Sequence, residues 1–343
     1  MTKDTQTLDT DAVAAYLRET LDGFEGPIEA EKFQGGQSNP TFLLRTPAKN
    51  YVLRRKPPGQ LLKSAHAVDR EFRVQSALQN TDVPVSKMHV LCEDDGVIGS
   101  MFYVMDHVDG RNFNEPTMQS ETNDTRTGVI DDMNRVLAAL HDVDIDAVGL
   151  SDYGPPGHYL ERQTGRWTKQ YRASETQDVP AMNTLIARLE EEMPADDGQR
   201  TLVHGDYRID NMMFERSGVK CLAVLDWELS TLGHPYADLA SVIMQWQLPA
   251  GPEGRGLGGV DRAALGLPSD EEFIAQYCQR RGIEKIENFG FFAGFCFFRM
   301  AAIIQGVLKR ALDGNASNPE LAMKVGAYAP IFAEMGLKAL DKN

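Results

Sequence analysis

The sequence predicts an α+β protein of two lobes: a small antiparallel β lobe with one inserted helix, and a large lobe that is mainly helical. Two observations predict this division. Short β segments dominate residues 28–105 and enclose a single stretch with helical spacing, whereas helical periods dominate after Gly110. We therefore expect an N-terminal lobe over residues 1–106 and a C-terminal lobe over residues 107–343.

The small lobe begins with a predicted helix, for which Asp9 or Thr10 supplies the N-cap. The Gly-rich segment GGQSN at 35–39 and the segment EDDG at 93–96 are expected to be turns between strands. The predicted elements are a helix at 11–22, β segments at 28–33, 40–46 and 51–56, a helix at 65–79, and β segments near 88–93 and 98–105.

The large lobe is predicted to contain six helices and one hairpin. The hairpin joins 212–214 to 221–227, and the Gly-rich segment 249–262 is expected to be a mobile surface loop because it lacks the GK[ST] ending of a P-loop. The helices are expected at about 125–141, 181–193, 236–247, 270–281, 288–311 and 319–340. The most apolar stretch, 290–308, is interrupted by Arg299 and Gln305 and is predicted to be a buried core helix and not a membrane span.

The composition excludes several classes of function. With 343 residues, 42% hydrophobic and 25% charged, the chain is typical of globular proteins. Its net charge of −15 repels nucleic acid and anionic membranes, so neither is an expected partner. Four cysteines without CxxC spacing favour reduced thiols, and the N-terminus has no apolar signal core. We expect a cytoplasmic protein, and its oligomeric state is left open.

The segment LVHGDYRIDNMMF at 202–214 carries the strongest chemical pattern. Asp206 and Asn211 are five residues apart, His204 precedes the aspartate by two, and Asp226 ends the second hairpin strand. Phosphoryl transfer needs such groups, because oxygen ligands must hold Mg²⁺ and a carboxylate must orient or deprotonate the attacking hydroxyl. We therefore predict Asp206 as the base and Asn211 and Asp226 as metal ligands. The alternative is that the first two are turn residues and Asp226 is a helix cap.

HGDYRIDN followed by LDWE resembles the catalytic loop and metal site of the aminoglycoside phosphotransferase and choline kinase superfamily, over roughly 28–340. The resemblance implies a bilobal protein-kinase-like fold with ATP and Mg²⁺ as cofactors. Gly205 and Trp227 stand where protein kinases have Arg and Phe, which favours a small-molecule acceptor. The resemblance also implies that Asp238, in GHPYADLA, braces the catalytic loop; a place in the first turn of a helix is the alternative for Asp238. His204 is predicted as a further catalytic residue.

The resemblance places the nucleotide in the small lobe. It implies that Arg54 binds the phosphates, although Arg55 and Lys56 are further candidates, and that Glu71 pairs with this cation. Residues 45–75 hold eight basic and two acidic side chains, which indicates an anion site or a solvated basic face. Met105 is a candidate for the adenine pocket or for plain core. The predicted nucleotide-binding residues are Gly35, Gly36, Ser38, Asn39, Arg54, Glu71, Met105, Asp106 and Val108.

The acceptor is predicted to bind an insert at 157–174 that is rich in Tyr, Arg and Trp. Helix packing explains these aromatic residues equally well. The candidates are Tyr159, Arg162, Gln163, Trp167, Tyr171, Trp246 and Arg299.

YVLRRKPPG, YLERQ and FFRMAAIIQGV are similar to segments of kinase-like proteins found beside or fused to acyl-CoA dehydrogenases. This resemblance implies a hydroxy acid or hydroxyacyl-CoA as acceptor, and enzymes of acyl-CoA metabolism as partners. The alternatives are an aminoglycoside or choline-type kinase, or an inactive nucleotide-binding regulatory module.

Overall fold

The small lobe is built around a five-stranded antiparallel sheet with the strand order β1-β2-β3-β5-β4. The computed structural model describes residues 7–33, 39–57, 67–251, 254–316 and 318–342. The small-lobe elements are α1 (Thr10–Thr20), β1 (Glu29–Lys32), β2 (Thr41–Arg45), β3 (Asn50–Arg55), α2 (Val68–Leu78), β4 (Met88–Cys92), α3 (Asp95–Ile98) and β5 (Phe102–Asp106). The predicted series of five strands with one inserted helix is confirmed.

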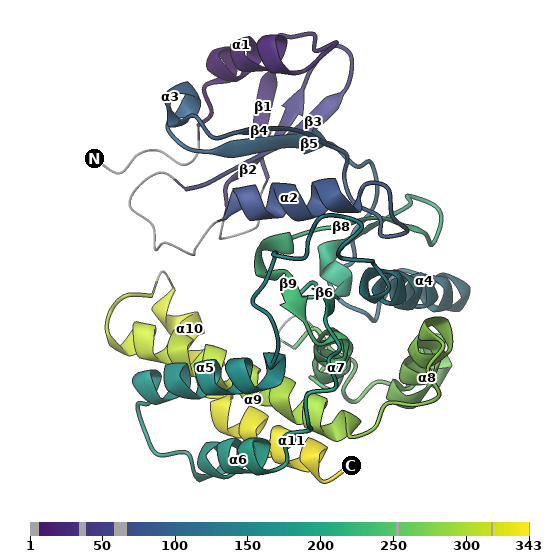
Figure 1. The fold of residues 1–343 in the computed structure, drawn as a ribbon, viewed down its shortest axis with the longest axis vertical. Helices are drawn as coiled ribbons and strands as arrows, with labels where there is room; N and C mark the ends of the chain where they lie inside the picture. Colours follow the sequence, from purple (N-terminus) through teal and green to yellow (C-terminus); the bar gives the residue numbers. More distant parts are fainter. Residues whose placement is uncertain (1–6, 34–38, 58–66, 252–253, 317, 343) are drawn as a thin grey trace.

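The two faces of this sheet have different neighbours (Figure 1). Helix α1 covers one face, where Val13 and Leu17 pack with Leu53 and Val104. Helix α2 covers the face toward the large lobe, where Val68 packs with Tyr103. Because side chains alternate along a strand, the neighbours of Leu53 on β3 point to the α2 face. One local prediction was wrong: EDDG opens the one-turn helix α3, capped by Asp94, whose carboxylate accepts from the Gly96 amide at 2.7 Å.

The large lobe is mainly helical and lies below α2 in Figure 1. Its helices are α4 (Asn123–His141), α5 (Tyr159–Ser174), α6 (Pro180–Glu191), α7 (Pro235–Trp246), α8 (Asp270–Arg281), α9 (Phe289–Leu312), α10 (Pro319–Gly326) and α11 (Ala329–Leu340). Its short strands form two pairs, β6 (Thr201–Val203) with β9 (Thr231–Gly233), and β7 (Met212–Phe214) with β8 (Cys221–Val224). Three 3₁₀ turns are η1 (Ile209–Asn211), η2 (Trp227–Leu229) and η3 (Ala263–Leu265). This division into a small sheet lobe and a large helical lobe matches the predicted fold class.

Two predictions for the large-lobe helices need correction. The segment expected as one helix over 319–340 is two helices, because Gly326 ends α10 and Pro330 stands in the first turn of α11. Proline has no N–H and cannot continue a helix from the preceding turn. The second correction is a further helix that was not among the six expected. Residues 159–174, within the predicted acceptor-binding insert at 157–174, form the regular helix α5.

Helix α9 is the central helix of the large lobe and packs against α11, α10, α7 and α5. Among the described residues it is the one helix that is long and apolar enough to cross a membrane, yet 72% of its most apolar window is buried inside the protein. This burial agrees with the predicted core helix, since apolar residues all around a helix indicate that it is enclosed by other elements.

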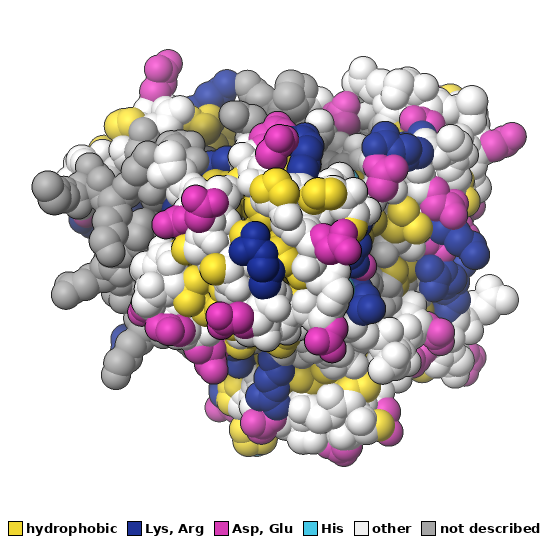
Figure 2. Space-filling model, turned by 90° about the horizontal axis from the view of Figure 1, so that it is seen from above, with side chains coloured by type: hydrophobic (Ala, Val, Ile, Leu, Met, Phe, Trp, Pro, Cys, Tyr) yellow, Lys and Arg dark blue, Asp and Glu magenta, His cyan; other side chains and the backbone are white. Residues whose placement is uncertain are grey.

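The face seen from above the small lobe carries basic and acidic side chains interspersed among polar and apolar atoms (Figure 2). The basic residues of 45–75 that the structure describes are distributed over several contacts and do not form one patch. Arg45 pairs with Glu31 at 2.7 Å, Lys49 pairs with Asp106 at 2.6 Å, and Arg73 pairs with Asp152. The basic run is therefore mostly a set of paired surface side chains.

Candidate active site

The catalytic loop, residues 204–211, leaves β6 and is held from below by Asp238 in the first turn of α7. The Asp238 carboxylate accepts hydrogen bonds from the backbone amides of His204 at 2.5 Å and Gly205 at 2.9 Å. Gly205 adopts φ +83°, and a Cβ at this position would lie 2.7 Å from the Leu229 carbonyl oxygen. Only glycine fits this turn, because both the dihedral angle and the space exclude a side chain.

Burial alone would raise the pKa of Asp238. The hydrogen bond and charge of His141, the charge of His204 and the Gly205 amide outweigh this effect, so the pKa lies below its ordinary value. His141 itself is buried, and burial lowers its pKa in spite of Asp238 at 3.6 Å. Asp238 therefore stays ionised and holds the loop through charge-assisted hydrogen bonds, which are stronger than neutral ones. We call Asp238, His141, His204 and Gly205 the catalytic-loop anchor.

His204 joins the catalytic loop to the segment that carries Asp226. Its Nε2 lies 2.8 Å from the Leu225 carbonyl oxygen, and its Nδ1 accepts from the Asp206 amide at 3.3 Å. These partners assign the proton to Nε2, so Nδ1 is an acceptor. The ring is fully buried and its centroid lies 4.8 Å from that of Trp227. His204 is thus a positioning residue.

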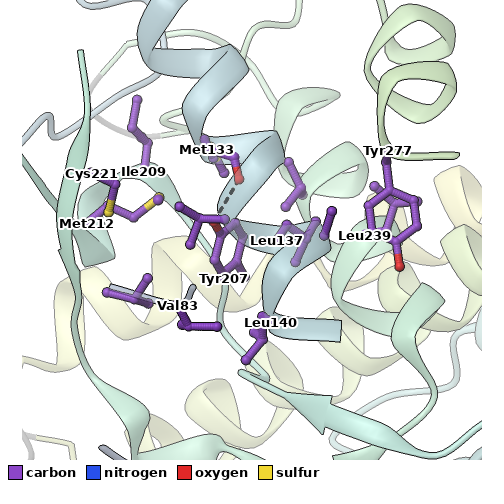
Figure 3. Close-up of a cluster of buried hydrophobic side chains, with 14 of the residues drawn as sticks. Val83, Met133, Leu137, Leu140, Tyr207, Ile209, Met212, Cys221, Leu239 and Tyr277 are labelled. Atoms are coloured by element: carbon purple, nitrogen blue, oxygen red, sulfur yellow. Dashed lines mark hydrogen bonds between the residues drawn. The ribbon is translucent and has the colours of Figure 1, made fainter. Parts of the chain in front are cut away.

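Alternate residues of the catalytic loop point in opposite directions. Tyr207 and Ile209 enter the core beside Met133 and Leu137, and the Tyr207 hydroxyl donates to the Met133 carbonyl oxygen at 2.8 Å (Figure 3). Asp206, which lies between His204 and Tyr207 in the sequence, remains partly exposed. The core beneath the loop therefore fixes its backbone while the polar side chains face away from the core.

The three predicted oxygen-bearing side chains come together at the end of the β7–β8 hairpin. The Asn211 amide group donates to the Asp206 backbone oxygen at 3.0 Å and to its Oδ2 at 3.1 Å. The Leu225 amide donates to the Asn211 carbonyl oxygen at 2.7 Å, which places Asp226 next to Asn211. Asp226 has a left-handed backbone with φ 62°, and its side chain accepts no capping hydrogen bond from η2. The geometry does not support the alternative of a helix cap.

These residues fit a magnesium site. The described residues contain no cluster of three or more His, Cys, Asp or Glu side chains around a common point. Mg²⁺ does not need one, because it commonly takes one or two protein ligands and completes its octahedron with phosphates and water. The Asn211 NH₂ group is engaged by Asp206, so its Oδ1 is the atom available to a cation. Asp226 supplies the carboxylate.

Arg54 is the cation of the small lobe that reaches this site. Its Nη2 lies 2.8 Å from Asp226 Oδ1 and 3.4 Å from Glu228 Oε2, and its Nε lies 2.9 Å from Glu71 Oε2. Burial alone would lower the Arg54 pKa, but Glu71, Tyr103, Asp226 and Glu228 raise it above its ordinary value. The guanidinium group therefore remains charged at the point where nucleotide phosphates are predicted.

Glu71 is almost completely buried behind Arg54. Its carboxylate accepts from the Asn39 amide at 2.8 Å and from the Tyr103 hydroxyl at 3.0 Å. Burial raises the pKa of Glu71, while Arg54 and the Tyr103 hydrogen bond oppose the rise. Its burial excludes an exposed pairing of Glu71 with neighbours on α2 as the alternative to the predicted pairing with Arg54.

The other two candidate cations point elsewhere. The Arg55 guanidinium lies over the Phe42 ring at 5.4 Å and donates to the Thr7 carbonyl oxygen, on the α1 side of the sheet. Lys56 lies 3.6 Å from Asp69. Among the three, the structure places Arg54 at the site.

The comparisons with known proteins agree with this geometry. Residues 29–282 match the profile of the phosphotransferase enzyme family that includes the aminoglycoside phosphotransferases. The chain belongs to this family.

A solved structure of a protein from Ralstonia eutropha, named as an aminoglycoside phosphotransferase, is 46% identical and superposes with a TM-score of 0.90 over 98% of this chain and 99% of that one. An aminoglycoside phosphotransferase solved with AMP-PNP and hygromycin B is 14% identical, with a TM-score of 0.63 over 96% and 98% of the two chains. The second likeness concerns the fold alone.

Two curated relatives carry a different name. The chain is 43% identical to acyl-CoA dehydrogenase family member 10 of Mus musculus, over 97% of this chain and 31% of the relative. It is 41% identical to family member 11 of Homo sapiens, over 96% and 43%. The phosphotransferase chain thus spans less than half the length of these curated relatives.

The predicted adenine-binding segment of this phosphotransferase follows β5. Met105 is partly buried and packs against Met88 and Tyr103 at the end of β5. The Asp106 carboxylate binds Lys49 and His89, each at 2.6 Å; burial opposes these contacts, but they lower its pKa. The Val108 amide has no hydrogen-bond partner among the described residues, so it can donate to a ligand. Gly35, Gly36 and Ser38 lie outside the described residues.

Two of the predicted acceptor residues lie next to the catalytic loop. Arg299 on α9 donates to the Gly205 carbonyl oxygen at 3.3 Å and to the Ser241 hydroxyl at 3.4 Å. Burial alone would lower its pKa, but Cys296, Tyr159, Asp238 and Asp206 raise it. Burial raises the pKa of Tyr159 to about 12, against the opposing charge of Arg299. Arg299 is thus held by a backbone carbonyl oxygen and a hydroxyl, with acidic residues nearby.

The remaining acceptor candidates are more dispersed. Arg162 donates to the carbonyl oxygens of Pro155 and Pro156. Trp167 packs against the α5–α9 core, Tyr171 is fully buried in it, and Gln163 is partly exposed on α5. Trp246 needs correction, because it is only 2% exposed and its ring lies 4.6 Å from that of Phe273 in the core. It therefore cannot contact an acceptor in this conformation.

Sequence reasoning missed four charged residues around the catalytic loop. Arg208 binds Asp210 through Nε at 2.8 Å, and Arg255 binds the same carboxylate at 2.8 Å. Glu228 approaches Arg54. The alternation of buried and exposed positions in DYRID pointed to Arg208 and Asp210, and the spacing of Asp226 and Glu228 pointed to a second carboxylate. The contact with Arg255 comes from a Gly-rich loop and had no signal in the sequence.

Proposed function

We propose that this phosphotransferase uses ATP and Mg²⁺ to phosphorylate a hydroxyl group of a small molecule, and that the acceptor is a hydroxy acid or its CoA thioester. The observation that carries the proposal is the convergence of Asp206, Asn211 and Asp226 with Arg54. Asp206 provides one carboxylate, Asn211 and Asp226 provide two oxygen ligands for a metal, and Arg54 provides a positive charge for the phosphates. Phosphoryl transfer needs these parts.

Each group has a distinct role. Asp206 accepts the proton of the attacking hydroxyl while the acceptor oxygen bonds to the γ-phosphorus and the bond to the β-phosphate oxygen breaks, so that ADP leaves. Arg54 stabilises the negative charge of the phosphates. Asn211 and Asp226 would hold Mg²⁺, which when bound neutralises charge on the phosphate oxygens. The anchor keeps the Asp206 backbone in place during the reaction.

The names of the curated relatives support the acceptor class, because proteins that share this domain are named for acyl-CoA dehydrogenation. The arginines on the acceptor side, Arg162 and Arg299, support an anionic acceptor over a polycationic drug. Enzymes of acyl-CoA metabolism would supply and consume such an acceptor, and we place the reaction in the cytoplasm. An aminoglycoside is the second candidate, favoured by the name of the Ralstonia protein at 46% identity.

The proposal is tested by measuring ADP release with hydroxy acids, their CoA thioesters, aminoglycosides and choline. For Asp206→Asn we expect turnover to fall by about three orders of magnitude or more, because the base is lost. Asp313→Asn, on the exposed end of α9 where Asp313 pairs with Lys309, is the matched control and should turn over at the wild-type rate. Chelation of Mg²⁺ should abolish the activity and magnesium should restore it. Equal rates for wild type and Asp206→Asn would exclude this function.

A further inference from the structure

A second cavity lies in the large lobe, at the end of the β6–β9 pair that is remote from Asp206. Its volume is about 490 Å³, which is in the range of small-molecule sites. Its walls are the start of α5, the segment 193–200, β9, the start of α7 and the start of α9. Tyr159 and Arg162, two of the predicted acceptor residues, line it.

Two arginines of the cavity wall carry charges that no carboxylate of the described chain neutralises. Arg162 is held by the carbonyl oxygens of Pro155 and Pro156, and Arg200 is held by those of Ser151 and Gly154. The Nε of Arg200 is buried and has no partner among the described residues. Carbonyl hydrogen bonds fix the direction of a guanidinium group but leave its positive charge uncompensated. The guanidinium groups of Arg162 and Arg200 can therefore bind an anion.

The carboxylates of the same wall are occupied. Glu287 pairs with Lys285 at 2.7 Å, and Asp197 accepts from Gln199 at 2.7 Å and from His234. Asp196 accepts from the His158 amide at 2.9 Å, and the exposed Glu161 lies 3.5 Å from the His158 ring. Backbone amides lower the pKa of Asp196, which keeps it ionised at the start of α5. The wall therefore presents two guanidinium groups held by carbonyl oxygens beside carboxylates held by amides or cations, and an anion would contact the arginines.

Three aromatic side chains also line the cavity. The Phe292 ring lies 4.7 Å from that of His234 and 5.3 Å from that of Tyr236, and all three residues line the cavity. Such rings stack on planar ligands. The N-termini of α5 and α9 also open here, and their N-cap residues His158 and Asn288 make no side-chain capping bond, which adds positive potential.

We propose that this cavity binds the adenine-nucleotide moiety of a ligand, with the phosphate on Arg162 and Arg200 and the base against Tyr236, the partly exposed ring of the three. Six residues separate Arg200 from Asp206, so their Cα atoms lie within roughly 20 Å of each other. Tyr159 bridges the two sites, because it lines the cavity and lies beside Arg299, which contacts Gly205.

Two kinds of ligand contain an adenine-nucleotide moiety. One is the nucleotide end of a CoA thioester whose hydroxyl reaches Asp206, and this source rests on the proposed function. The other is a free adenine nucleotide that acts as an effector, and this source does not.

The test is a calorimetric titration of CoA, and separately of AMP, into protein saturated with a non-hydrolysable ATP analogue and Mg²⁺. We expect saturable binding to wild type, weakened about ten- to a hundredfold in Arg162→Ala and in Arg200→Ala, because each loses a charge-assisted hydrogen bond. Arg166→Ala is the matched control, since Arg166 is an exposed arginine one turn further along α5 and outside the cavity wall. It should bind as wild type does.

Binding of CoA alone would identify the acceptor as the source, and equal binding of AMP would identify a free nucleotide. The proposal is overturned if neither probe binds at millimolar concentration, or if both arginine variants bind as tightly as wild type. A melting curve of each variant checks that it folds. If Arg200→Ala does not fold, the affinity of Arg162→Ala alone tests the proposal. Because the ATP analogue occupies the nucleotide site, binding measured in its presence reports the cavity and does not depend on catalysis.

Discussion

The catalytic-loop anchor and helix α5 lie in the same lobe, yet they hold their polar groups in opposite ways. In the anchor, Asp238 is buried and binds two amides, and His204 has a partner on each ring nitrogen; one buried anchor atom among the described residues, His141 Nε2 at 3.6 Å from Asp238, makes no hydrogen bond. On α5, the Thr164 hydroxyl, the Trp167 indole N–H and the Tyr171 hydroxyl are buried without partners among the described residues. The comparison teaches that the protein fixes the loop at 204–211 by hydrogen bonds, and holds α5 mainly by apolar packing.

Removing the charge of the anchor should have the largest effect. In Asp238→Asn the amides of His204 and Gly205 lose a charged acceptor, and one must face an NH₂ group or a neutral oxygen. We expect the free energy of unfolding to fall by about 3 kcal/mol and kcat to fall about 100-fold through misplacement of Asp206. Urea unfolding and ADP-release kinetics measure both. Wild-type kcat in this variant would show that the anchor does not position the loop.

Gly205→Ala tests the same region through the backbone. The new Cβ would require a left-handed conformation and would collide with the Leu229 carbonyl oxygen. We expect a loss of about 1–3 kcal/mol together with reduced kcat. Gly165→Ala on α5, where nothing lies within 4 Å of the added Cβ, is the matched control and should be neutral or slightly stabilising, because alanine favours helices.

The pH dependence of stability should also come from the anchor. Burial lowers the pKa of His141, and it lowers that of His234 as well. The unfolded chain therefore binds protons at higher pH than the native protein, so stability is lost as the pH falls below the ordinary histidine value of about 6.5. The slope is at most about 1.4 kcal/mol per pH unit for each group. Denaturant unfolding at pH 7.5 and 5.5 measures it, and His141→Gln should reduce the difference.

The smallest effect is expected on α5, where a substitution should leave the free energy of unfolding unchanged or raise it. Tyr171→Phe removes a buried hydroxyl that has no partner, so the free energy of unfolding should stay constant or rise by up to about 1 kcal/mol. KM for the acceptor should not change if the helix only packs. A raised KM with unchanged stability would instead show that the hydroxyl binds the acceptor, and α5 would then resemble the anchor more closely than we argue.

The same contrast explains what the sequence could predict. The catalytic loop was predictable because its groups are local, with Asp206 and Asn211 five residues apart and Asp226 at the end of one hairpin. The break between α10 and α11 had visible signals in Gly326 and Pro330 that the helical period concealed. Contacts between distant segments had no such signal, and the burial of Trp246 against Phe273 on α8 is one example.

Helix α5 shows most clearly what could not be predicted from the sequence. Only Leu160, Thr164, Tyr171 and Ser174 are buried along its 16 residues, which is too sparse an apolar stripe to separate a helix from a polar insert. The sequence likewise could not assign the phosphate-binding role to Arg54 over Arg55 and Lys56. Neighbouring side chains on β3 point to opposite faces of the sheet, but only the structure shows which face is covered by α1 and which by α2.

The ion pair between Arg54 and Asp226 joins side chains that are 172 positions apart and belong to different lobes. The same carboxylate oxygen cannot bind a guanidinium group and a divalent cation at the same time without weakening both interactions. If Asp226 holds Mg²⁺ and Arg54 binds the phosphates, as we propose, the two side chains would separate when both ligands bind. Until then Arg54 is the internal counter-ion of Asp226.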